Sequence, residues 1–241
     1  SDKMSEMRTS LFQGLLDTAN FNFKNGNHDM MLFEWGNVFE QEAEGLEGIK
    51  EKLYLSGLAH GFYLKSSVHS DESLPASFHL IKGIVGALFS RLKINDINYD
   101  KFEDISIGLE DTHTVKVDSE IIGYIGKLSS KFDNLLNLAI GESYGFQFDL
   151  IQLMKLADIK NEYKPVVVYP SMIRDLNFVL DETIPVGEII HVINKNGKNI
   201  LIDSEPVSIF RDSSIGDNNK AVAINLIFQS SKKTLEDKDV N

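Results

Sequence analysis

Apolar and polar positions follow two different periods along the first 158 residues, which predicts a domain that mixes helices with strands. Where apolar residues recur every three or four positions, as Leu11, Leu15 and Ala19 do, one face of a helix is apolar. Short apolar runs bounded by Gly, Asn or Asp indicate strands. The expected elements are a helix over 9–21, strands over 30–39 and 52–62, a helix over 75–92 with Pro75 in its first turn, a hairpin over 112–128 turning near Asp118 and Ser119, a helix over 129–138 and a strand over 144–150. We expect an antiparallel sheet with helices packed on it, an α+β fold.

The pattern changes after a linker at 159–165, so we expect a second domain over 166–241. Its elements are expected to be strands over 172–181, 200–211 and 220–230, with helices over 185–196 and from 235 onward. Pro185 suits the first position of a helix, and Gly197 suits a left-handed cap after its end. The order β-α-β-β-α is the ferredoxin-like order without its last strand.

Composition and charge limit the classes of protein to which this chain can belong. The formal net charge is −12, which disfavours a general nucleic-acid binder, but residues 1–163 carry −10 of it and residues 164–241 only −2. No run of 18 apolar residues and no signal peptide is present, so we expect no membrane span. The absence of Cys excludes disulfides and fits a reducing cytoplasm. The chain starts without Met and stops as an expected helix begins, so we expect a piece of a longer polypeptide.

Catalytic and metal-binding motifs are missing from the sequence. No phosphate-binding loop, nucleophile elbow or Cys nucleophile occurs, and no two His residues have the HxxxH spacing. Clamping a nucleoside triphosphate takes several cations, and four arginines in the whole chain are few for that purpose. We therefore predict no catalytic residue, no metal site and no cofactor in this chain.

One aromatic residue is expected on the face of the second sheet that has fewer apolar side chains. If Val207 and Ile209 face the core together with Val222, then Phe210 faces the other way, beside Arg211. Small and polar residues surround it there, among them Ser208 and Asn225 on neighbouring strands. The ring either stacks an RNA base, or is an edge-strand Phe covered by another part of the protein. From alternation alone, the covered ring is the commoner explanation.

Seven segments together suggest a known family. The N-terminal ones are MRTSLFQGLL, LFEWGNVF, FHLIKGIVGALF and EIIGYIGKL, and the C-terminal ones are YPSMIRDLNFVL, VSIFRD and KAVAINLIFQ. With these segments the sequence resembles, over nearly its whole length, the beta subunit of bacterial phenylalanyl-tRNA synthetases, and the C-terminal segments are similar to the ferredoxin-fold anticodon-binding domain that ends this subunit. Each motif is modest, but their order and spacing together are specific.

The resemblance implies that catalysis and RNA binding belong to different parts of the enzyme. The N-terminal module is expected to be a class II synthetase-like core that has lost its chemistry, because LFEWG at 32–36 holds no Arg where an active core has one. Catalysis with ATP and Mg²⁺ is expected in the alpha subunit of a tetramer of two alpha and two beta chains. The C-terminal domain is expected to bind the anticodon stem-loop of tRNA(Phe) rather than DNA.

The same resemblance gives the candidate RNA-binding residues. Phe210 takes the place of a family aromatic that stacks on an anticodon base, which favours the stacking interpretation. Ser208 and Asn225 would share the face of the sheet with it, and Arg211, Lys198 and Lys220 would contact phosphates. The chain departs from the family at Phe210, where Tyr is usual, at Asp212 and in the loop 213–219. An alternative therefore remains open, a scaffold that docks the alpha subunit with little RNA contact.

Overall fold

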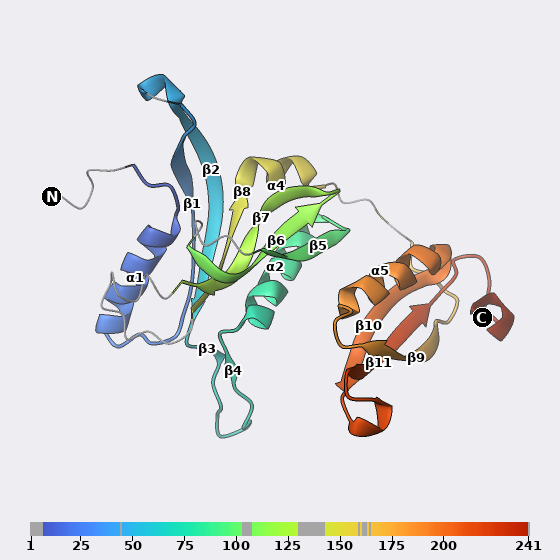
Figure 1. Cartoon of the computed structure of the whole chain (residues 1–241). Helices are drawn as coiled ribbons and strands as arrows, with labels where there is room; N and C mark the ends of the chain where they lie inside the picture. The colour runs from blue at the N-terminus through green and yellow to red at the C-terminus, as the bar shows by residue number, and fades with distance from the viewer. Residues whose placement is uncertain are drawn as a thin grey trace. The chain divides into compact units, whose positions relative to one another are not determined.

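The chain forms two compact units, residues 1–161 and 162–241, which are described separately below (Figure 1). The computed structural model describes residues 7–43, 45–102, 108–129, 143–158, 160, 163 and 165–240, with only the backbone at Leu46 and Lys198. The helix expected over 129–138 lies outside the described residues, apart from Ser129.

The first unit is built on an antiparallel sheet, as the sequence predicted. In chain order its elements are α1 (Phe12–Lys24), β1 (Met30–Gln41), the 3₁₀ helix η2 (Leu46–Gly48), β2 (Ile49–His60), β3 (Phe62–Leu64), β4 (Leu74–Pro75), α2 (Phe78–Leu92), β5 (Ile97–Phe102), β6 (Leu109–Val117), β7 (Glu120–Leu128), β8 (Ser143–Asp149) and α4 (Leu150–Leu156). Six strands pair in the order β1-β2-β8-β7-β6-β5, and every neighbouring pair is antiparallel. Strands β3 and β4 pair separately.

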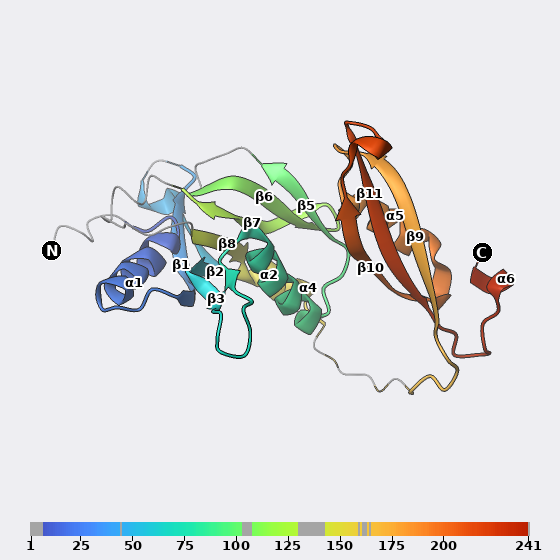
Figure 2. The same cartoon turned by 90° about the horizontal axis from the view of Figure 1, so that it is seen from below.

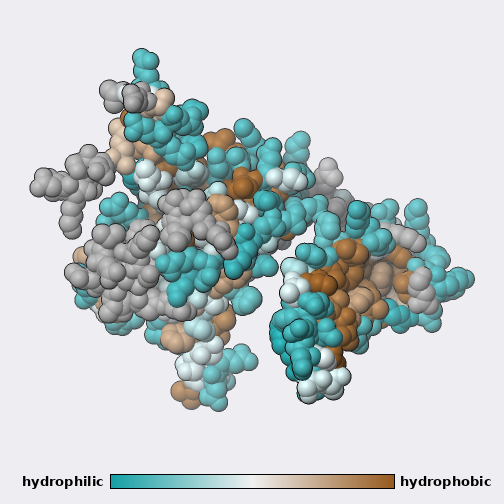
Figure 3. Space-filling model, viewed as in Figure 1, coloured by the Kyte–Doolittle hydropathy of each residue, from teal (hydrophilic) through white to brown (hydrophobic). Residues whose placement is uncertain are grey.

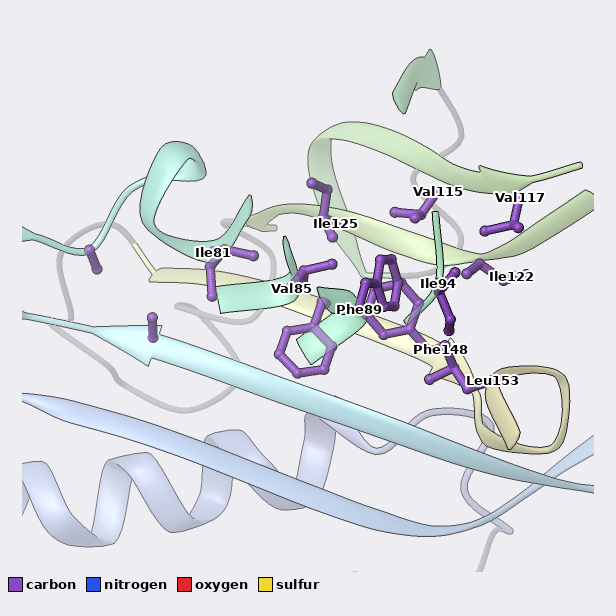
Figure 4. Packing of buried hydrophobic residues seen from close by; sticks show 13 residues of the cluster. Ile81, Val85, Phe89, Ile94, Val115, Val117, Ile122, Ile125, Phe148 and Leu153 are labelled. Carbon is purple, nitrogen blue, oxygen red and sulfur yellow. The ribbon is translucent and has the colours of Figure 1, made fainter. Parts of the chain in front are cut away.

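Helices cover both faces of this sheet. The apolar face of α1 packs on one side, against side chains of β1, β2, β6 and β7. On the other side α2 and α4 bury a larger cluster, and Figure 4 shows Ile81, Val85 and Phe89 of α2 among the apolar side chains of the sheet. The Phe89 ring lies 5.2 Å from the ring of Phe148, centroid to centroid, and both side chains are fully buried. Removing either ring should cost about 3–5 kcal/mol of stability.

The local structure of the first unit corrects the expected start of one helix and adds two elements. Helix α2 begins at Phe78, not at 75, because the Ser77 hydroxyl caps it by accepting a hydrogen bond from the Leu80 amide at 3.1 Å. Pro75 instead pairs with Phe62 in the β3–β4 hairpin. Strand β5, of six residues, and helix α4, of seven, were not predicted, because so few residues carry too little periodicity to identify an element.

The hairpin of β6 and β7 confirms its prediction. Asp118 and Ser119 join the strands and both have positive φ, 49° and 71°. Two successive residues in the left-handed region are the signature of a type I′ turn, whose twist matches that of the strands it joins.

The second unit follows the ferredoxin-like order that the sequence predicted. Its elements are β9 (Met172–Asp181), α5 (Val186–Asn196), the 3₁₀ helix η3 (Lys198–Ile200), β10 (Leu201–Phe210), the 3₁₀ helix η4 (Ser213–Ile215), β11 (Asn219–Phe228) and α6 (Asp237–Val240). Three strands pair antiparallel in the order β10-β11-β9 (Figure 2). Apolar residues of α5 pack on one face of the sheet, against Val222, Ile224, Leu226 and Phe228 of the central strand.

Gly197 ends α5 for a different reason from the one predicted. Its φ is −68°, an ordinary right-handed value, so it is no left-handed cap. The chain turns directly into η3 and brings Leu201 back over this position. A Cβ on Gly197 would lie 2.3 Å from Cδ2 of Leu201, so close approach, not backbone freedom, requires the glycine.

Two residues expected in the core of the second unit are exposed. Val207 is 67% exposed and Ile209 is 46% exposed. A β-bulge between Pro206 and Ser208 leaves Val207 without a partner on β11, and Ile209 shares the face of Val222 but lies on an edge strand. Figure 3 shows apolar surface on this unit, over the region of α5 and β10. Within the described part of the chain, no helix is long and apolar enough to span a membrane.

Candidate nucleic-acid interface

The open face of the second sheet carries Phe210 where alternation placed it. Phe210 lies opposite Ala221 on β11, and Ala221 lies opposite Val179 on β9, so the three side chains form one row across the sheet. The Phe210 side chain is 56% exposed, and Val179 is exposed as well. A small residue between two larger apolar ones makes this row a shallow platform on which a planar ring can lie.

Ser208 and Asn225 lie on the same face, at increasing distance from the ring. Ser208 is in the next row with Ala223 and Asn177. Asn225 is four positions from Ala221 on β11, about 13 Å along the strand at the usual rise per residue. Its amide donates to Oδ1 of Asp175 at 2.8 Å. Asn225 therefore cannot touch a base that stacks on Phe210, although it can contact a different nucleotide.

Carboxylates gather at the end of the face away from Phe210. Glu205, Asn225 and Asp175 form one row, and Asp203 and Ile227 belong to the row beyond it. Phosphate groups are repelled by such a surface. The open face is thus apolar at the Phe210 end and acidic at the other, so a base ring is accommodated better at the first end.

Arg211 follows Phe210 directly, but its guanidinium is already paired. Its Nε donates to Oε2 of Glu182 at 3.0 Å and its Nη2 donates to Oε1 at 2.7 Å. This pairing lowers the pKa of the Glu182 carboxyl and raises the pKa of Arg211, so both stay charged at neutral pH. Sequence patterns did not point to Glu182, because it lies 29 residues before its partner.

Lys220 does not lie on the open face, where it would contact a phosphate of bound RNA. Its side chain lies on the α5 side of the sheet, opposite Leu180, and the residue is only 6% exposed. Its ammonium donates to the main-chain carbonyl of Glu182 at 2.8 Å. Lys220 is thus buried and engaged away from the open face, and its contact with a phosphate stays a prediction. The side chain of Lys198 lies outside the described atoms.

A hollow of about 440 Å³ adjoins this corner of the sheet. The lining residues are Glu182, Arg211, Asp212, Ser213, Gly216, Asp217 and Asn219. Asp212 shapes the loop because its Oδ1 accepts a hydrogen bond from the Ser214 amide at 2.8 Å. The loop 213–219, which departs from the family pattern, thus brings further negative charge beside Arg211.

The first unit shows no arrangement for nucleotide chemistry among its described residues. Arg8 is held by Oε1 of Glu34 at 2.7 Å and by the Asn37 carbonyl at 2.7 Å, and Arg91 lies exposed on α2. No group of three or more His, Asp or Glu side chains in the described residues could hold a metal ion. The arginine pair that a triphosphate needs is therefore not assembled in this part of the structure.

A polar pocket of about 480 Å³ lies in the first unit and was not foreseen from the sequence. Glu40 accepts from the Lys52 ammonium at 2.5 Å and from the Tyr54 hydroxyl at 3.1 Å. The Lys52 contact lowers the pKa of Glu40, while burial and the Glu40 charge raise the pKa of Tyr54. These groups satisfy one another, so none of them is an activated nucleophile or base.

An apolar groove of about 310 Å³ lies between β1 and α2. Its lining includes Met31 and Phe33 of β1 and Ile84 and Leu88 of α2. Phe33 is exposed and stacks on Trp35, with ring centroids 6.1 Å apart. Exposed aromatic residues beside an apolar groove are typical of a protein-interaction surface.

Comparison with known families matches both units. Residues 1–150 match the model of the phenylalanyl tRNA synthetase beta chain CLM domain. Residues 168–241 match that of the ferredoxin-fold anticodon binding domain. The two matches follow one another along the chain without overlap.

Similar proteins include the phenylalanine–tRNA ligase beta subunits of several bacteria. The protein of Listeria innocua serovar 6a is 31% identical over 241 residues, and that of Carboxydothermus hydrogenoformans is 30% identical over 242 residues. Each match covers 100% of this chain and 30% of the relative, so the chain spans about 30% of the length of these curated relatives. A crystal structure of pyrrolysyl-tRNA synthetase from Desulfitobacterium hafniense matches 61% of this chain and 48% of its own, with 14% identity and a TM-score of 0.44.

Proposed function

Because this chain belongs to the phenylalanyl-tRNA synthetase beta chain family, we propose that it supplies scaffold and tRNA anticodon recognition to a phenylalanine–tRNA ligase. The whole enzyme would join phenylalanine to its tRNA with ATP and Mg²⁺, and the alpha subunit would hold the catalytic site. Two alpha and two beta chains would assemble in the cytoplasm. This chain would contribute no catalytic residue and hold no cofactor.

The observation that carries the RNA-binding part is the exposed ring of Phe210 on a sheet face that no helix covers among the described residues of its unit. Single-stranded RNA loops are recognised by laying unstacked bases on aromatic side chains, and each stack contributes roughly 1–3 kcal/mol. An anticodon loop presents such bases, whereas duplex DNA does not. With a net charge of −12, the chain is unsuited to holding nucleic acid by its phosphates alone.

The apolar groove beside Phe33 and Trp35 favours a second contribution, docking of the alpha subunit by the first unit. In that alternative the second unit touches little RNA, and the engaged Arg211 and buried Lys220 agree with it. RNA recognition and docking of the alpha subunit are both compatible with membership of the family. The contribution of Phe210 to RNA affinity decides between them.

Phe210→Ala, in the enzyme assembled with its alpha subunit, is the deciding variant. The ring fills no core space, so the melting temperature should change little compared with the loss expected for a buried Phe. Affinity for the anticodon stem-loop of tRNA(Phe) should fall about 5- to 150-fold, the equivalent of one lost stack. Ile209→Ala, on the same strand but the opposite face, should leave the affinity unchanged and serves as the matched control.

Two outcomes would count against base stacking. If Phe210→Ala lowers the melting temperature strongly while affinity is unchanged, the ring is structural. If neither quantity changes, the scaffold alternative is favoured.

A further inference from the structure

At one end of the open face, the exposed ring of Phe210 lies next to Arg211 in sequence. The guanidinium of Arg211 is already bound by Glu182. Both oxygens of Glu182 accept from two different nitrogens of Arg211, the forked geometry that a phosphate would otherwise adopt with the same group. A phosphate that approaches Arg211 must therefore displace a carboxylate that already has the preferred arrangement.

Glu182 is fixed in place by its main chain. Its amide donates to the Asn218 carbonyl at 2.8 Å, and its carbonyl accepts from the Lys220 ammonium at 2.8 Å. Lys220 is buried on the α5 side of the sheet, so this second anchor is shielded from solvent. The backbone of Glu182 is therefore held on both sides, which fixes the point on the sheet edge from which its side chain reaches Arg211.

Further carboxylates lie near Arg211. Asp212 and Asp217 line the same hollow as Glu182, so this hollow is lined by three carboxylates and one guanidinium. Such a site repels a phosphate but does not repel an uncharged base, whose ring needs only the platform of Phe210, Ala221 and Val179.

We propose that Glu182 is a specificity-determining residue that keeps phosphate off Arg211, so that this corner accepts a base ring without gripping the backbone of the RNA. Lys220 is then a positioning residue that acts through the main chain of Glu182. The identity of the ligand as an anticodon base rests on the proposed function, but the exclusion of phosphate does not.

The first test compares stem-loop affinity across a series of salt concentrations for the whole chain and for Glu182→Gln. Release of Arg211 should tighten binding on the order of fivefold. It should also steepen the plot of log affinity against log salt by about 0.7, the increment for one single-strand phosphate. Adding Arg211→Gln to Glu182→Gln should abolish both changes.

Asp217→Asn is the matched control because it removes one negative charge from the same hollow without releasing Arg211. It should leave the salt slope unchanged. If Asp217→Asn has the same effect as Glu182→Gln, net charge alone explains the result and the proposal is wrong. Equal slopes for Glu182→Gln and the unaltered chain would also overturn it.

The second test needs no RNA and uses inorganic pyrophosphate as the probe. The Nε–H signal of Arg211, assigned by its loss in Arg211→Gln, is followed by NMR as pyrophosphate is added. It should shift in Glu182→Gln and stay in place in the unaltered chain. A shift of equal size in both proteins would overturn the proposal. If no protein binds the stem-loop, the proposed function fails, while this second test still decides the role of Glu182.

Discussion

At the residue scale, the direction of a polar side chain is decided by sheet geometry as much as by its chemistry. Lys220 is two positions before Val222 on β11, so both side chains share the face that α5 covers. The same alternation that correctly placed Phe210 on the open face thus already put Lys220 on the other one. Its nitrogen donates there to the main-chain carbonyl of Glu182, so the buried polar group has a hydrogen-bond partner.

We expect His60 to make the stability of the first unit sensitive to pH. It is 5% exposed, its Nδ1 lies 3.0 Å from the Ser143 hydroxyl, and the charged or titratable groups facing it are Asp29 and His28. Burial lowers the pKa of His60 below its ordinary value of 6.5, so the unfolded chain binds the proton more readily. The stabilisation is therefore complete above about pH 6.5 and is lost as the pH falls below it.

We expect the melting temperature to drop between pH 7.5 and pH 5.5, and to drop less in His60→Gln. Thermal unfolding at both pH values measures this. His69→Gln, at an exposed loop position, should keep the full pH dependence. An identical pH dependence in His60→Gln and the unaltered chain would show that other groups, such as His113, whose pKa burial also lowers, dominate the effect.

At the element scale, local capping and hairpin chemistry set the boundaries that periodicity leaves open. The apolar pattern of α2 extends back toward Pro75, but the helix begins where the Ser77 hydroxyl can receive the Leu80 amide. Residues before Ser77 pair as strands with the segment after Gly61 instead. Pro75, which would be tolerated in the first turn of a helix, therefore lies in a hairpin.

Ser77→Ala should destabilise the first unit by about 1 kcal/mol, because a capping hydroxyl is lost from the helix that carries Phe89 into the core. In a unit of this size the melting temperature should fall by about 2–4 °C. Ser77→Asp should retain most of the stability, since a carboxylate caps as well. Ser90→Ala, at an exposed position inside the same helix, should cause no loss. A loss as large in Ser90→Ala would argue against the cap.

At the scale of the whole molecule, the four arginines are divided between the two units, and three of them are held by carboxylates. Arg8 and Arg91 belong to the first unit, where Arg8 is held by Glu34. Arg174 and Arg211 belong to the second, where each is paired with a carboxylate, Arg174 with Asp237 and Arg211 with Glu182. No triphosphate clamp is formed by the residues that the structure describes.

We therefore expect this chain alone to give no phenylalanine-dependent exchange of pyrophosphate into ATP. The enzyme assembled with the alpha subunit provides the positive control under the same conditions. Exchange by the isolated chain that clearly exceeds a blank without protein would contradict the assignment of the first unit as a non-catalytic module.

The sequence by itself determined the fold class, the order of the longer elements and the face on which Phe210 lies. These follow from periods of 2.0 and 3.6 residues, which backbone geometry imposes within a few consecutive positions. Only the tertiary structure decided what Arg211 and Lys220 do, because their partner Glu182 lies 29 and 38 residues away along the chain. It also decided that Val207 and Ile209 are exposed, since a bulge and an edge position depend on neighbouring strands. Alternation fixes the side of a sheet on which a residue lies, but the charge available to a ligand depends on which distant group the fold brings beside it.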